Sequence, residues 1–369
     1  MATAKDLAAI QNLIANPLDR FAAGPKTVAG IIGDGPSHYS KSPALWNAAF
    51  RDLGMNATYL PFDVDDRRVG DLLCVLRDCQ QFLGVNVTVP HKLRVIDFLD
   101  QFDGGAARLG AVNTIVKTAD GKLRGYNTDG EGFIESLLLP SPEQHEAFMK
   151  SLHGMDVLLL GAGGSARAVA FHVSDRIGAG RLIVCNRTLE HAECLAGEIG
   201  KLGRQAIAID EVGISNWAPK VGLIINSTTK GQGGIRQLAN GLATILEPYS
   251  ALAPANPPSL AADLGDNFEQ RWREAARADA EANNRSSESL AQSIPQATRF
   301  YDLIYHPEET VFLRHGRLSG HQTMNGKHMI IRQAVIAFCH RICQRQLAQL
   351  GKYDDATFAQ VADVMYRAW

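Results

Sequence analysis

The stretch "MDVLLLGAGGSARAVAFHV", residues 155–173, decides the fold. Its apolar run "VLLL" predicts a buried strand, and the residues after the glycines have the apolar spacing of a helix. Gly161 permits a tight turn between the two elements, and Ala166 lets the helix pack closely on the strand. The stretch therefore predicts a strand, a turn and a helix, which is the building step of a parallel α/β sheet.

The same glycine turn predicts a nucleotide site. The pattern G-x-G-x-x-A lets the backbone at Gly163 approach a pyrophosphate, and the start of the helix offers free N–H groups to the phosphates. A glycine turn with a purely structural use is the alternative. Because an apolar strand precedes the pattern and a helix follows it, we favour dinucleotide binding.

The end of the next predicted strand, "RLIVCNR" at 181–187, indicates which dinucleotide. An NAD site usually carries Asp or Glu here, whose carboxylate binds the ribose hydroxyls and repels a 2′-phosphate. This chain has the neutral Asn186 and Thr188 and, between them, Arg187, whose guanidinium can pair with a phosphate dianion. NADP is therefore favoured. Glu190 could weaken that preference, and Arg187 could instead be a solvated charge at a helix start.

Strands and helices also alternate on both sides of this unit. The first third of the chain has three β-rich runs separated by segments with helical spacing, which predicts a parallel β-α-β-α-β arrangement. Asp120-Gly121 predicts the turn of a hairpin. The expected strands are 27–34, 57–64, 82–89, 155–160, 181–187 and 221–228, the helices between the first three strands are 42–54 and 67–79, and the hairpin covers 111–127.

The alternation predicts an α/β protein of two domains. Residues 1–128 are expected to form an α/β domain and 129–329 a Rossmann-like domain, with helices in 330–369 that return to the first domain. The stretch from about 234 to 296 differs in kind. Its residues 251–265 are rich in proline and alanine, and its residues 267–293 are charged, helical at their start and polar at their end. We interpret it as a partly mobile insertion in the second domain.

Composition argues against several kinds of partner. The 37 basic and 39 acidic residues give a formal net charge of −2, which leaves no basic excess for nucleic-acid phosphates or anionic lipid. Residues 1–21 predict a short amphipathic helix rather than a signal peptide, and no segment is long and apolar enough to span a bilayer. The 6 cysteines form no CxxC pair and no zinc-binding set. We therefore expect free thiols in a cytoplasmic protein without a metal.

The stretch "NVTVPHK", residues 86–92, carries the strongest candidate for a catalytic group. Pro90 is expected to start a helix, with Lys92 two residues into it and just beyond the carboxyl end of a strand, where parallel sheets place their ligands. A ketone reduced with a nicotinamide cofactor develops negative charge on oxygen and needs an acid within hydrogen-bond reach. Lys92 can supply that proton, although a lone lysine is more often a solvated surface charge.

A set of short motifs occurs in an order found in one known family. In this order the set resembles the shikimate dehydrogenases, or shikimate/quinate dehydrogenase family, across about residues 27–350, apart from the long insertion and a shorter one near 139–152. The motifs are "YSKSP" (39–43), "NVTVPHK" (86–92), "GAVNT" (110–114), "NTDGEG" (127–132), "GAGGSAR" (161–167), "NRT" (186–188), "IINST" (224–228), "YHPEETVFL" (305–313) and "NGKHMIIRQA" (325–334).

The resemblance implies a reaction and a separate role for each domain. The reaction would be the reversible, NADPH-dependent reduction of 3-dehydroshikimate to shikimate, in aromatic amino acid biosynthesis, with no metal. The N-terminal domain, completed by the C-terminal helices, would bind the substrate, and the active site would lie in the cleft between it and the NADP domain. The partner would be a small-molecule substrate, and the chain would be a monomer or a homodimer.

The resemblance also implies roles for individual residues. Lys92 and Asp129 would be the catalytic pair, with Asp129 holding the lysine and compensating its charge. Taken singly, Ser42 could instead cap a helix and Asp129 could be a turn residue. Hydroxyl and amide side chains would bind the substrate, namely Ser40, Ser42, Asn86, Thr88, Asn113 and Gln333, with Tyr305 near its carboxylate and the nicotinamide. The cofactor residues would be Gly161, Ala162, Gly163, Gly164, Ser165, Ala166, Asn186, Arg187, Thr188, Ser227, Thr228, Gly326 and Met329.

Some positions depart from the family pattern. Tyr39 and Trp46 stand where many members have histidine, and His91 replaces a common aromatic residue beside the lysine. A relative that acts on quinate or an amino-substituted analogue, with NADP or NAD, is one alternative. The replacements that accompany quinate use, a threonine for one "YSKSP" serine and a histidine for Val89, are absent here. A non-catalytic NADP-binding regulator is the other alternative, and the intact catalytic pair argues against it.

Overall fold

The structure, a computed structural model, describes residues 4–18, 26–238, 240–262 and 267–369. It contains two compact units, Met1–Glu146 with Met329–Trp369, and Ala147–His328. The α/β class, the two domains and the return of the C-terminal helices to the first unit are confirmed. The boundary between the two units lies between Glu146 and Ala147. The boundary expected from the sequence was after residue 128.

The first unit is built on a sheet with the strand order β2-β1-β3-β5-β6-β4. β1 pairs in parallel with β2 and with β3, as expected for strands joined by helical crossovers. The pairs β3–β5 and β5–β6 are antiparallel, and the second is the expected hairpin. The strands are β1 Thr27–Gly33, β2 Ala57–Asp63, β3 Phe82–Val87, β4 Gln101–Phe102, β5 Thr114–Lys117 and β6 Leu123–Tyr126.

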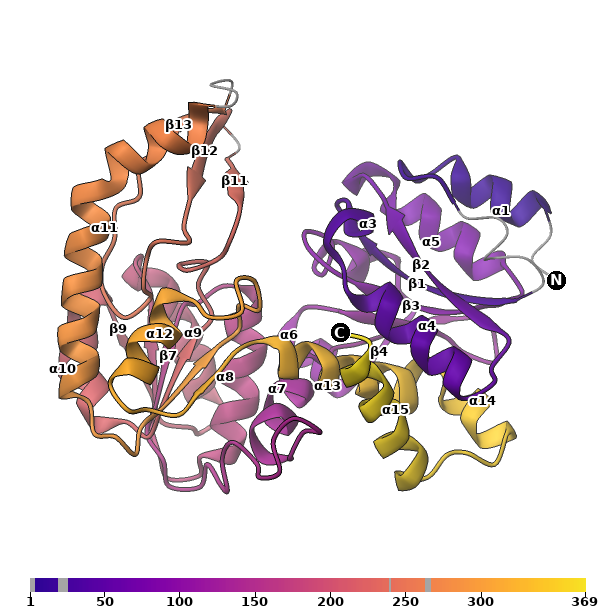
Figure 1. Ribbon diagram of the computed structural model, residues 1–369. Coiled ribbons are helices and arrows are strands. Elements are labelled where there is room, and N and C mark those ends of the chain that lie inside the picture. Colours follow the sequence, from indigo (N-terminus) through magenta and orange to yellow (C-terminus); the bar gives the residue numbers. More distant parts are fainter. Residues whose placement is uncertain (1–3, 19–25, 239, 263–266) are drawn as a thin grey trace. The chain divides into compact units, whose positions relative to one another are not determined.

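Helices cover both faces of this sheet, and the C-terminal helices lie on the same face as α4 (Figure 1). Side chains alternate along a strand, so Val28 joins the core under α1 and α5 while Ala29 joins the core with Trp46 and Phe338. The helices of this region are α1 Ala4–Gln11, α3 Pro36–Tyr39, α4 Ser42–Asp52, α5 Val69–Asp78, α6 Gly104–Leu109, α7 Asp129–Leu138, α13 Lys327–Ala337, α14 Gln344–Gln349 and α15 Asp355–Arg367, with a π-helical segment at Phe338–Ile342.

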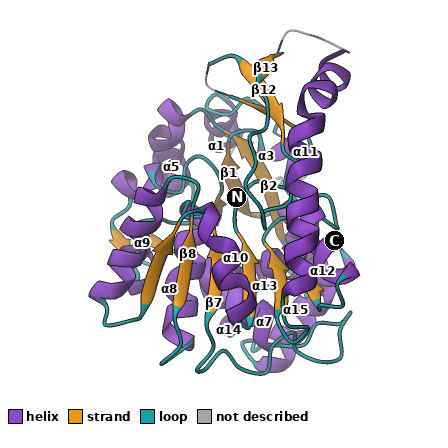
Figure 2. Ribbon diagram, turned by 90° about the vertical axis from the view of Figure 1, so that its left-hand side faces the viewer, coloured by secondary structure: helices purple, strands orange, loops and turns teal. Residues whose placement is uncertain are grey.

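The second unit is built on a sheet of order β15-β14-β10-β7-β8-β9, in which every pair is parallel. β7 has β8 on one side (Figure 2) and β10 on the other. From β7 the chain adds β8 and β9 in one direction and then β10, β14 and β15 in the other, so the strand order reverses between β7 and β10. Ligand crevices of open parallel sheets form outside the carboxyl ends of the strands at such a point. The elements are β7 Val157–Leu160, α8 Gly164–Arg176, β8 Leu182–Cys185, α9 Leu189–Lys201, β9 Ala206–Ile209, α10 Ile214–Trp217, β10 Leu223–Asn226, β14 Arg299–Asp302, α12 Val311–Leu318 and β15 Thr323–Met324.

The insertion expected at about 234–296 forms a small substructure within the second unit. Three short antiparallel strands, in the order β11-β12-β13, lie beside one end of a long helix, α11 (Figure 1). Tyr249 and Trp272 are buried between the strands and the helix. The elements are β11 Ile235–Gln237, β12 Leu242–Ile245, β13 Leu260–Ala261 and α11 Phe268–Ser293.

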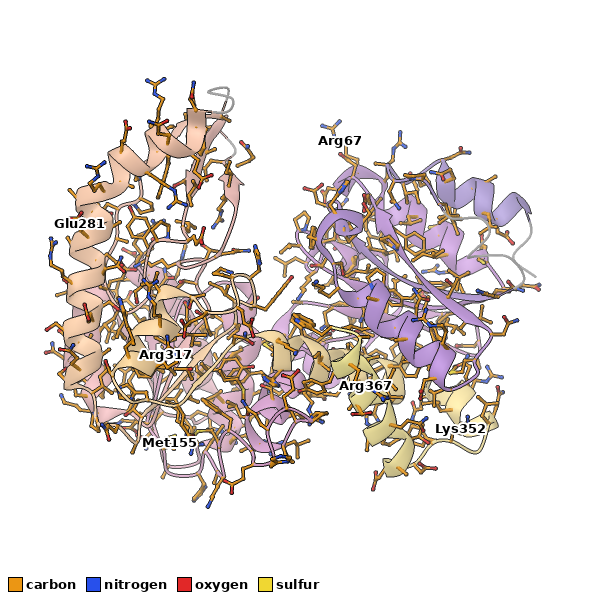
Figure 3. All side chains as sticks on the ribbon, in the orientation of Figure 1. Arg67, Met155, Glu281, Arg317, Lys352 and Arg367 are labelled. Atoms are coloured by element: carbon orange, nitrogen blue, oxygen red, sulfur yellow. The ribbon has the colours of Figure 1, made fainter. Side chains whose placement is uncertain are left out.

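Residues 267–293 were expected to be helical at their start and polar at their end, and α11 extends further than expected because it continues through the polar end. Asn283 and Ser287 are buried. The Asn283 side-chain amide donates to the carbonyls of Ser250 and Ala253 at 3.1 and 3.0 Å, and Ser287 Oγ donates to Ser250 Oγ at 2.7 Å. Since these bonds satisfy the polar groups, polar residues can form the packed face of the helix. Its exposed face carries charges such as Glu281 (Figure 3).

The helix expected to start at Pro90 is not formed either. The chain makes turns after β3 and enters only a short 3₁₀ helix, Arg94–Phe98. The carbonyl of Lys92 accepts the N–H of Val112 at 2.8 Å, so it is already used by the neighbouring chain segment. Val89, expected inside the strand, is 66% exposed. Lys92 therefore lies in a turn rather than on a helix.

The described part of the N-terminal segment begins with a short helix. α1 occupies part of the amphipathic helix expected at 1–21, and residues 1–3 and 19–21 lie outside the described residues. Leu7 and Ile10 of α1 pack into the first core, as the apolar stripe predicts. Within the described ranges, no helix combines the length and the apolar character needed to cross a membrane.

Candidate active site

A lysine and a carboxylate meet in the first unit. Lys92 comes from the turn after β3 and Asp129 is the first residue of α7, and the Lys92 Nζ to Asp129 Oδ2 distance is 2.6 Å. The side chain of Lys92 is 29% exposed and that of Asp129 is 12% exposed. Partial removal from water strengthens the attraction between the two charges, while the lysine still reaches solvent. The structure thus brings together the two residues predicted to be catalytic.

The carboxylate of Asp129 is held on both of its oxygens. Oδ2 accepts from Lys92, and Oδ1 accepts from Asn113 Nδ2 at 2.8 Å. The backbone N–H of Asp129 donates to Asn127 Oδ1 at 3.1 Å. Asp129 lies in the first turn of α7, where the helix dipole favours a negative charge. Asp129 is therefore the fixed partner of the lysine and belongs to a helix rather than to a turn.

A second set of buried polar groups lies next to this pair in the first sheet. Asn86 Nδ2 donates to Thr114 Oγ1 at 3.0 Å, and the Tyr59 hydroxyl donates to Asn86 Oδ1 at 2.7 Å. Burial raises the pKa of Tyr59 well above 10.0, and its hydrogen bond with Ser42 opposes that shift only in part. Tyr59 is therefore a neutral donor. Tyr59 was not predicted from the sequence, although a tyrosine in the buried strand of "ATYLPFDV" needs a hydrogen-bond partner.

The serines of "YSKSP" lie at the start of α4. The Ser42 N–H donates to Ser40 Oγ at 3.2 Å, and Ser42 is buried. No side chain caps α4, so the capping role considered for Ser42 is not observed. Thr88 is half-buried, and its methyl group lies only 2.4 Å from the position that a Cβ on Gly33 would take. Glycine at 33 therefore makes room for Thr88.

Gln333 reaches the same region from the C-terminal part of the chain. Thr128 Oγ1 donates to Gln333 Oε1 at 3.3 Å, and Gln333 Nε2 donates to the Ile330 carbonyl at 3.0 Å. α13 can approach α7 this closely because Gly132 has no side chain, since a Cβ there would lie 2.5 Å from the Gln333 backbone nitrogen. The close packing of α13 on α7 thus explains why the second glycine of "NTDGEG", Gly132, has to be a glycine.

Two of the departures from the family pattern are packing residues. The His91 ring is buried, with Nε2 2.9 Å from the Val64 carbonyl oxygen and Nδ1 3.3 Å from Asp66 Oδ1. Trp46 is fully buried and stacks on Tyr59 with ring centroids 4.7 Å apart. Neither ring is an exposed group beside Lys92. Tyr39, by contrast, is 45% exposed.

In the second unit, the predicted glycine turn lies at the carboxyl end of β7, where the strand order reverses. Gly161 has a φ of 109°, and a Cβ there would lie 2.6 Å from Ser227 Oγ at the end of β10. Only glycine fits such a turn. A Cβ on Gly163 or Gly164 would meet no atom within 4 Å, so this part of the backbone is open to a ligand. The open backbone at the start of α8 fits a pyrophosphate.

A hollow of about 700 Å³ opens at these strand ends, which is within the usual size of a small-molecule site. Asn186 joins two of its loops, because Oδ1 accepts from the Ala162 N–H at 3.2 Å and Nδ2 donates to the Thr188 carbonyl at 2.8 Å. Arg187 is exposed beside it. The predicted cofactor residues on the wall are Gly161, Ala162, Gly163, Asn186, Arg187, Thr188, Ser227 and Thr228.

Other predicted residues lie outside this wall. A Cβ on Gly326 would lie 2.0 Å from the Leu303 carbonyl oxygen, so that glycine allows two segments to pack. Burial raises the pKa of Tyr305, which belongs to the second unit, unlike the other predicted substrate residues. The predicted cofactor residues outside the wall are Gly164 and Ser165, exposed at the start of α8, and the buried Ala166, Gly326 and Met329.

Several charged residues of the hollow were not predicted from the sequence. Lys230 Nζ lies 2.7 Å from Glu211 Oε1, and Arg236 Nη1 donates to Thr229 Oγ1 at 2.7 Å. Lys230 stands two residues after "IINST", which was a possible signal. Arg236 belongs to the insertion, where no motif predicted a contact with this hollow.

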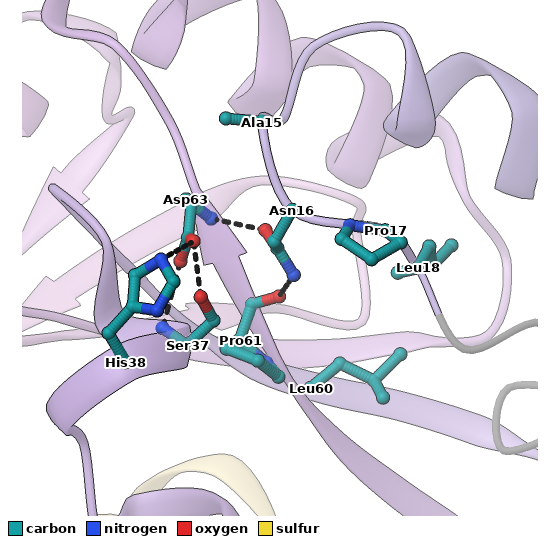
Figure 4. A pocket seen from close by; sticks show the side chains of 9 residues that line it. All are labelled: Ala15, Asn16, Pro17, Leu18, Ser37, His38, Leu60, Pro61 and Asp63. Carbon is teal, nitrogen blue, oxygen red and sulfur yellow. Dashed lines mark hydrogen bonds and ion pairs between the residues drawn. The ribbon is translucent and has the colours of Figure 1, made fainter.

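A second hollow, of about 490 Å³, lies in the first unit between the segment after α1 and the end of β2 (Figure 4). Asp63 accepts the Ser37 N–H at 2.9 Å and also the Ser37 hydroxyl. Asn16 accepts the Asp63 N–H at 2.8 Å and donates to the Pro61 carbonyl at 3.1 Å. These polar groups bind neighbouring chain segments, and no predicted site residue lines the hollow. The hydrogen bonds of Asn16 therefore attach the segment after α1 to β2.

Comparison with known proteins gives consistent results. The family described as "Shikimate dehydrogenase substrate binding domain" matches residues 31–115, and "Shikimate / quinate 5-dehydrogenase" matches 143–237. The chain is 34% identical to shikimate dehydrogenase (NADP(+)) of Lysinibacillus sphaericus over 84% of this chain and 90% of that protein. It is 35% identical to the enzyme of the same name from Moorella thermoacetica, over 82% and 84%.

A solved structure is similar along nearly the whole chain. It is shikimate 5-dehydrogenase from Thermus thermophilus, crystallised in complex with NADP(H) and shikimate. The two sequences are 26% identical, the TM-score is 0.60, and the alignment covers 93% of this chain and 99% of the other.

Proposed function

The chain belongs to the shikimate dehydrogenase family, and we propose that it catalyses the reversible, NADPH-dependent reduction of 3-dehydroshikimate to shikimate. The observation that carries the proposal is the partly buried ion pair between Lys92 and Asp129, which places a proton donor beside a fixed carboxylate. The names of the relatives and the Thermus thermophilus complex with NADP(H) and shikimate support it.

We assign substrate binding to the first unit. The substrate has one carboxylate and several ring hydroxyls, so its site needs hydroxyl donors for the anion and amides for the hydroxyls. Ser40 and Ser42 are the proposed carboxylate ligands. Tyr305, from the second unit, is proposed to act near the substrate carboxylate. The proposed ligands of the ring hydroxyls are Asn86, Thr88, Asn113 and Gln333.

We assign cofactor binding to the second unit, whose residues fit NADPH. The open backbone at Gly163 and Gly164, at the start of α8, fits a pyrophosphate, and Arg187 with Thr188 fits the phosphate on the adenosine ribose. When bound, NADPH supplies the hydride that reduces the carbonyl carbon of the substrate. The glycine turn and the hollow hold the cofactor, and the catalytic side chains handle the proton.

The proton step falls to Lys92. As the carbonyl carbon is reduced, negative charge develops on the oxygen, and the Lys92 ammonium transfers a proton to it, so that one N–H bond breaks and one O–H bond forms. Asp129 stabilises the ammonium before the transfer and holds Nζ in place during it. In the reverse direction the neutral amine takes the proton from the alcohol. Because Lys92 is partly exposed, it can then exchange its proton with solvent.

The test is a steady-state assay of the purified protein on shikimate and quinate, each with NADP⁺ and NAD⁺, followed by the absorbance of the reduced cofactor. We expect the highest kcat/KM for shikimate with NADP⁺. Absence of shikimate oxidation with both cofactors would refute the activity, while family membership would stand. We further propose a cytoplasmic enzyme, which its free cysteines suit, and a monomer or homodimer, which light scattering would distinguish.

A further inference from the structure

Part of the insertion lines the hollow that we propose for NADP. Arg236 of β11 and Thr244 of β12 lie on its wall together with Arg187. Arg236 and Thr244 are directly opposite each other in the antiparallel pair. Side chains at opposite positions project from the same face of a sheet. That face of the small sheet therefore belongs to the cofactor hollow.

Arg236 is held at the wall by a defined contact. Its Nη1 donates to Thr229 Oγ1 at 2.7 Å, and Thr229 directly follows Ser227 and Thr228 at the end of β10. A guanidinium has five N–H donors, so this bond leaves donors for a ligand. Since the residue is exposed, an anion can reach it.

The wall carries an excess of positive charge. Among the described residues of the wall, Glu211 is the only carboxylate, and it binds Lys230 with a distance of 2.7 Å between Oε1 and Nζ. The side chains of this pair are only 16% and 12% exposed, so their charges largely cancel. Arg187 and Arg236 are left without an opposing carboxylate on the wall. Two planar guanidinium groups suit a phosphate dianion.

The strand that carries Arg236 is supported from behind. Ile245 of β12 packs with Tyr249 and with Trp272 of α11. Trp272 Nε1 donates to the Pro258 carbonyl at 2.7 Å, and Thr244 Oγ1 donates to the same carbonyl at 2.8 Å. These contacts attach the small sheet to α11, and therefore give Arg236 a fixed support.

We infer that the insertion is part of the cofactor site, and that Arg236 supplies a second guanidinium, in addition to Arg187, to the 2′-phosphate that NADP has and NAD lacks. The inference rests on the proposed NADP site. It makes the insertion a specificity element of the second unit. It also explains why a polar strand with an arginine is built onto the edge of a nucleotide hollow.

The test measures binding without turnover. Isothermal titration of the whole protein with adenosine 2′,5′-bisphosphate and with AMP compares two ligands that differ in the 2′-phosphate. Arg236→Gln should weaken the bisphosphate by about ten- to a hundred-fold, as expected for a lost hydrogen bond to a charged group, and change AMP little. Arg187→Gln should show the same pattern, and Arg236→Lys should retain part of the preference because the charge remains.

Arg277→Gln is the matched control, because it removes an exposed arginine of the same insertion that does not line the hollow. It should leave both affinities unchanged. Unchanged bisphosphate affinity in Arg236→Gln, or an equal loss for both ligands in Arg236→Gln and Arg236→Lys, would overturn the inference. If the bisphosphate preference depends on Arg236 but the protein does not oxidise shikimate, the inference holds and the proposed reaction fails.

Discussion

Lys92 Nζ donates to Asp129 Oδ2 at 2.6 Å, although 37 residues separate the two along the chain. The turn after β3 carries the lysine, and the start of α7 carries the carboxylate. Asn113 occupies the other carboxylate oxygen, so Asp129 cannot rotate without losing a hydrogen bond. The lysine therefore has one defined position in the first unit, and the predictions on catalysis follow from it.

Replacing Lys92 by alanine removes the proposed proton donor. We expect kcat for shikimate oxidation to fall by roughly 10²–10⁴-fold, the usual effect of losing a general acid or base. KM for shikimate should change much less, because the carboxylate and hydroxyls of the substrate have other ligands. Lys122→Ala is the control, since Lys122 is exposed and pairs with Asp120 at 3.1 Å near the hairpin turn. Near-normal turnover in Lys92→Ala would remove the lysine from the mechanism.

Asp129→Asn changes charge but little shape. The new amide oxygen can still accept from Asn113, whereas the amide NH₂ would face Lys92 Nζ, so that two donors oppose each other. We expect a fall chiefly in kcat, with a melting temperature close to that of the wild type. Steady-state kinetics and thermal unfolding would measure both. A change confined to KM would show that Asp129 serves binding and does not position the lysine.

Asp302 should make the stability of the second unit depend on pH. Burial raises the pKa of this carboxyl from 3.8 to about 7, against the lowering effect of hydrogen bonds from Thr310, Ile304 and Asn226. The folded state thus favours the protonated form. The stabilising contribution is complete below pH 3.8 and is lost as the pH rises through about 7. In Asp302→Asn, the neutral amide can keep hydrogen bonds to Thr310 and Asn226. This variant should therefore not lose stability as the pH rises.

Urea unfolding between acid and neutral pH would measure this effect. The free energy of unfolding of Asp302→Asn relative to wild type should increase with pH up to about 7 and then level off. Asp78→Asn, which removes an exposed carboxylate at the end of α5, is the control. Its free energy of unfolding relative to wild type should not show this increase up to about pH 7. A difference between Asp302→Asn and wild type that is independent of pH would show that folding does not raise the pKa of Asp302.

The sequence predicts those parts of the fold whose pattern is local. The strand, glycine turn and helix at 155–173 form as expected, because an apolar run, Gly161 and helical spacing each act within a few residues. The polar end of α11 could not be predicted in this way. Asn283 and Ser287 are satisfied inside a helix because distant segments bind them, among them the loop at Ser250.

The same distinction holds for the candidate site. The position of Lys92 after a strand made it a candidate, and the family resemblance implies that Lys92 and Asp129 act as a pair. The role of Tyr59 could not be recognised, because its partner Asn86 lies on another strand, 27 residues away. Arg236 had no local signal at all, since its place on the wall depends on how β11 pairs with β12. Long-range pairing therefore limits prediction more than residue chemistry does.

The last prediction is that shikimate is preferred over quinate. Shikimate has a ring double bond next to its carboxylate, so the carboxylate lies near the ring plane. Quinate has a tetrahedral carbon there with an additional hydroxyl. A site that accepts both must change shape around the carboxylate.

The serines proposed to bind that carboxylate have little freedom to do so. The Ser42 N–H donates to Ser40 Oγ at 3.2 Å, and Ser42 is buried with a hydrogen bond to the buried Tyr59. A buried polar group left without a partner costs about 1–3 kcal/mol. We therefore expect kcat/KM for shikimate to exceed that for quinate by roughly ten- to a hundred-fold. Comparable values for the two substrates would refute this preference, yet would leave the roles of Lys92 and Asp129 intact.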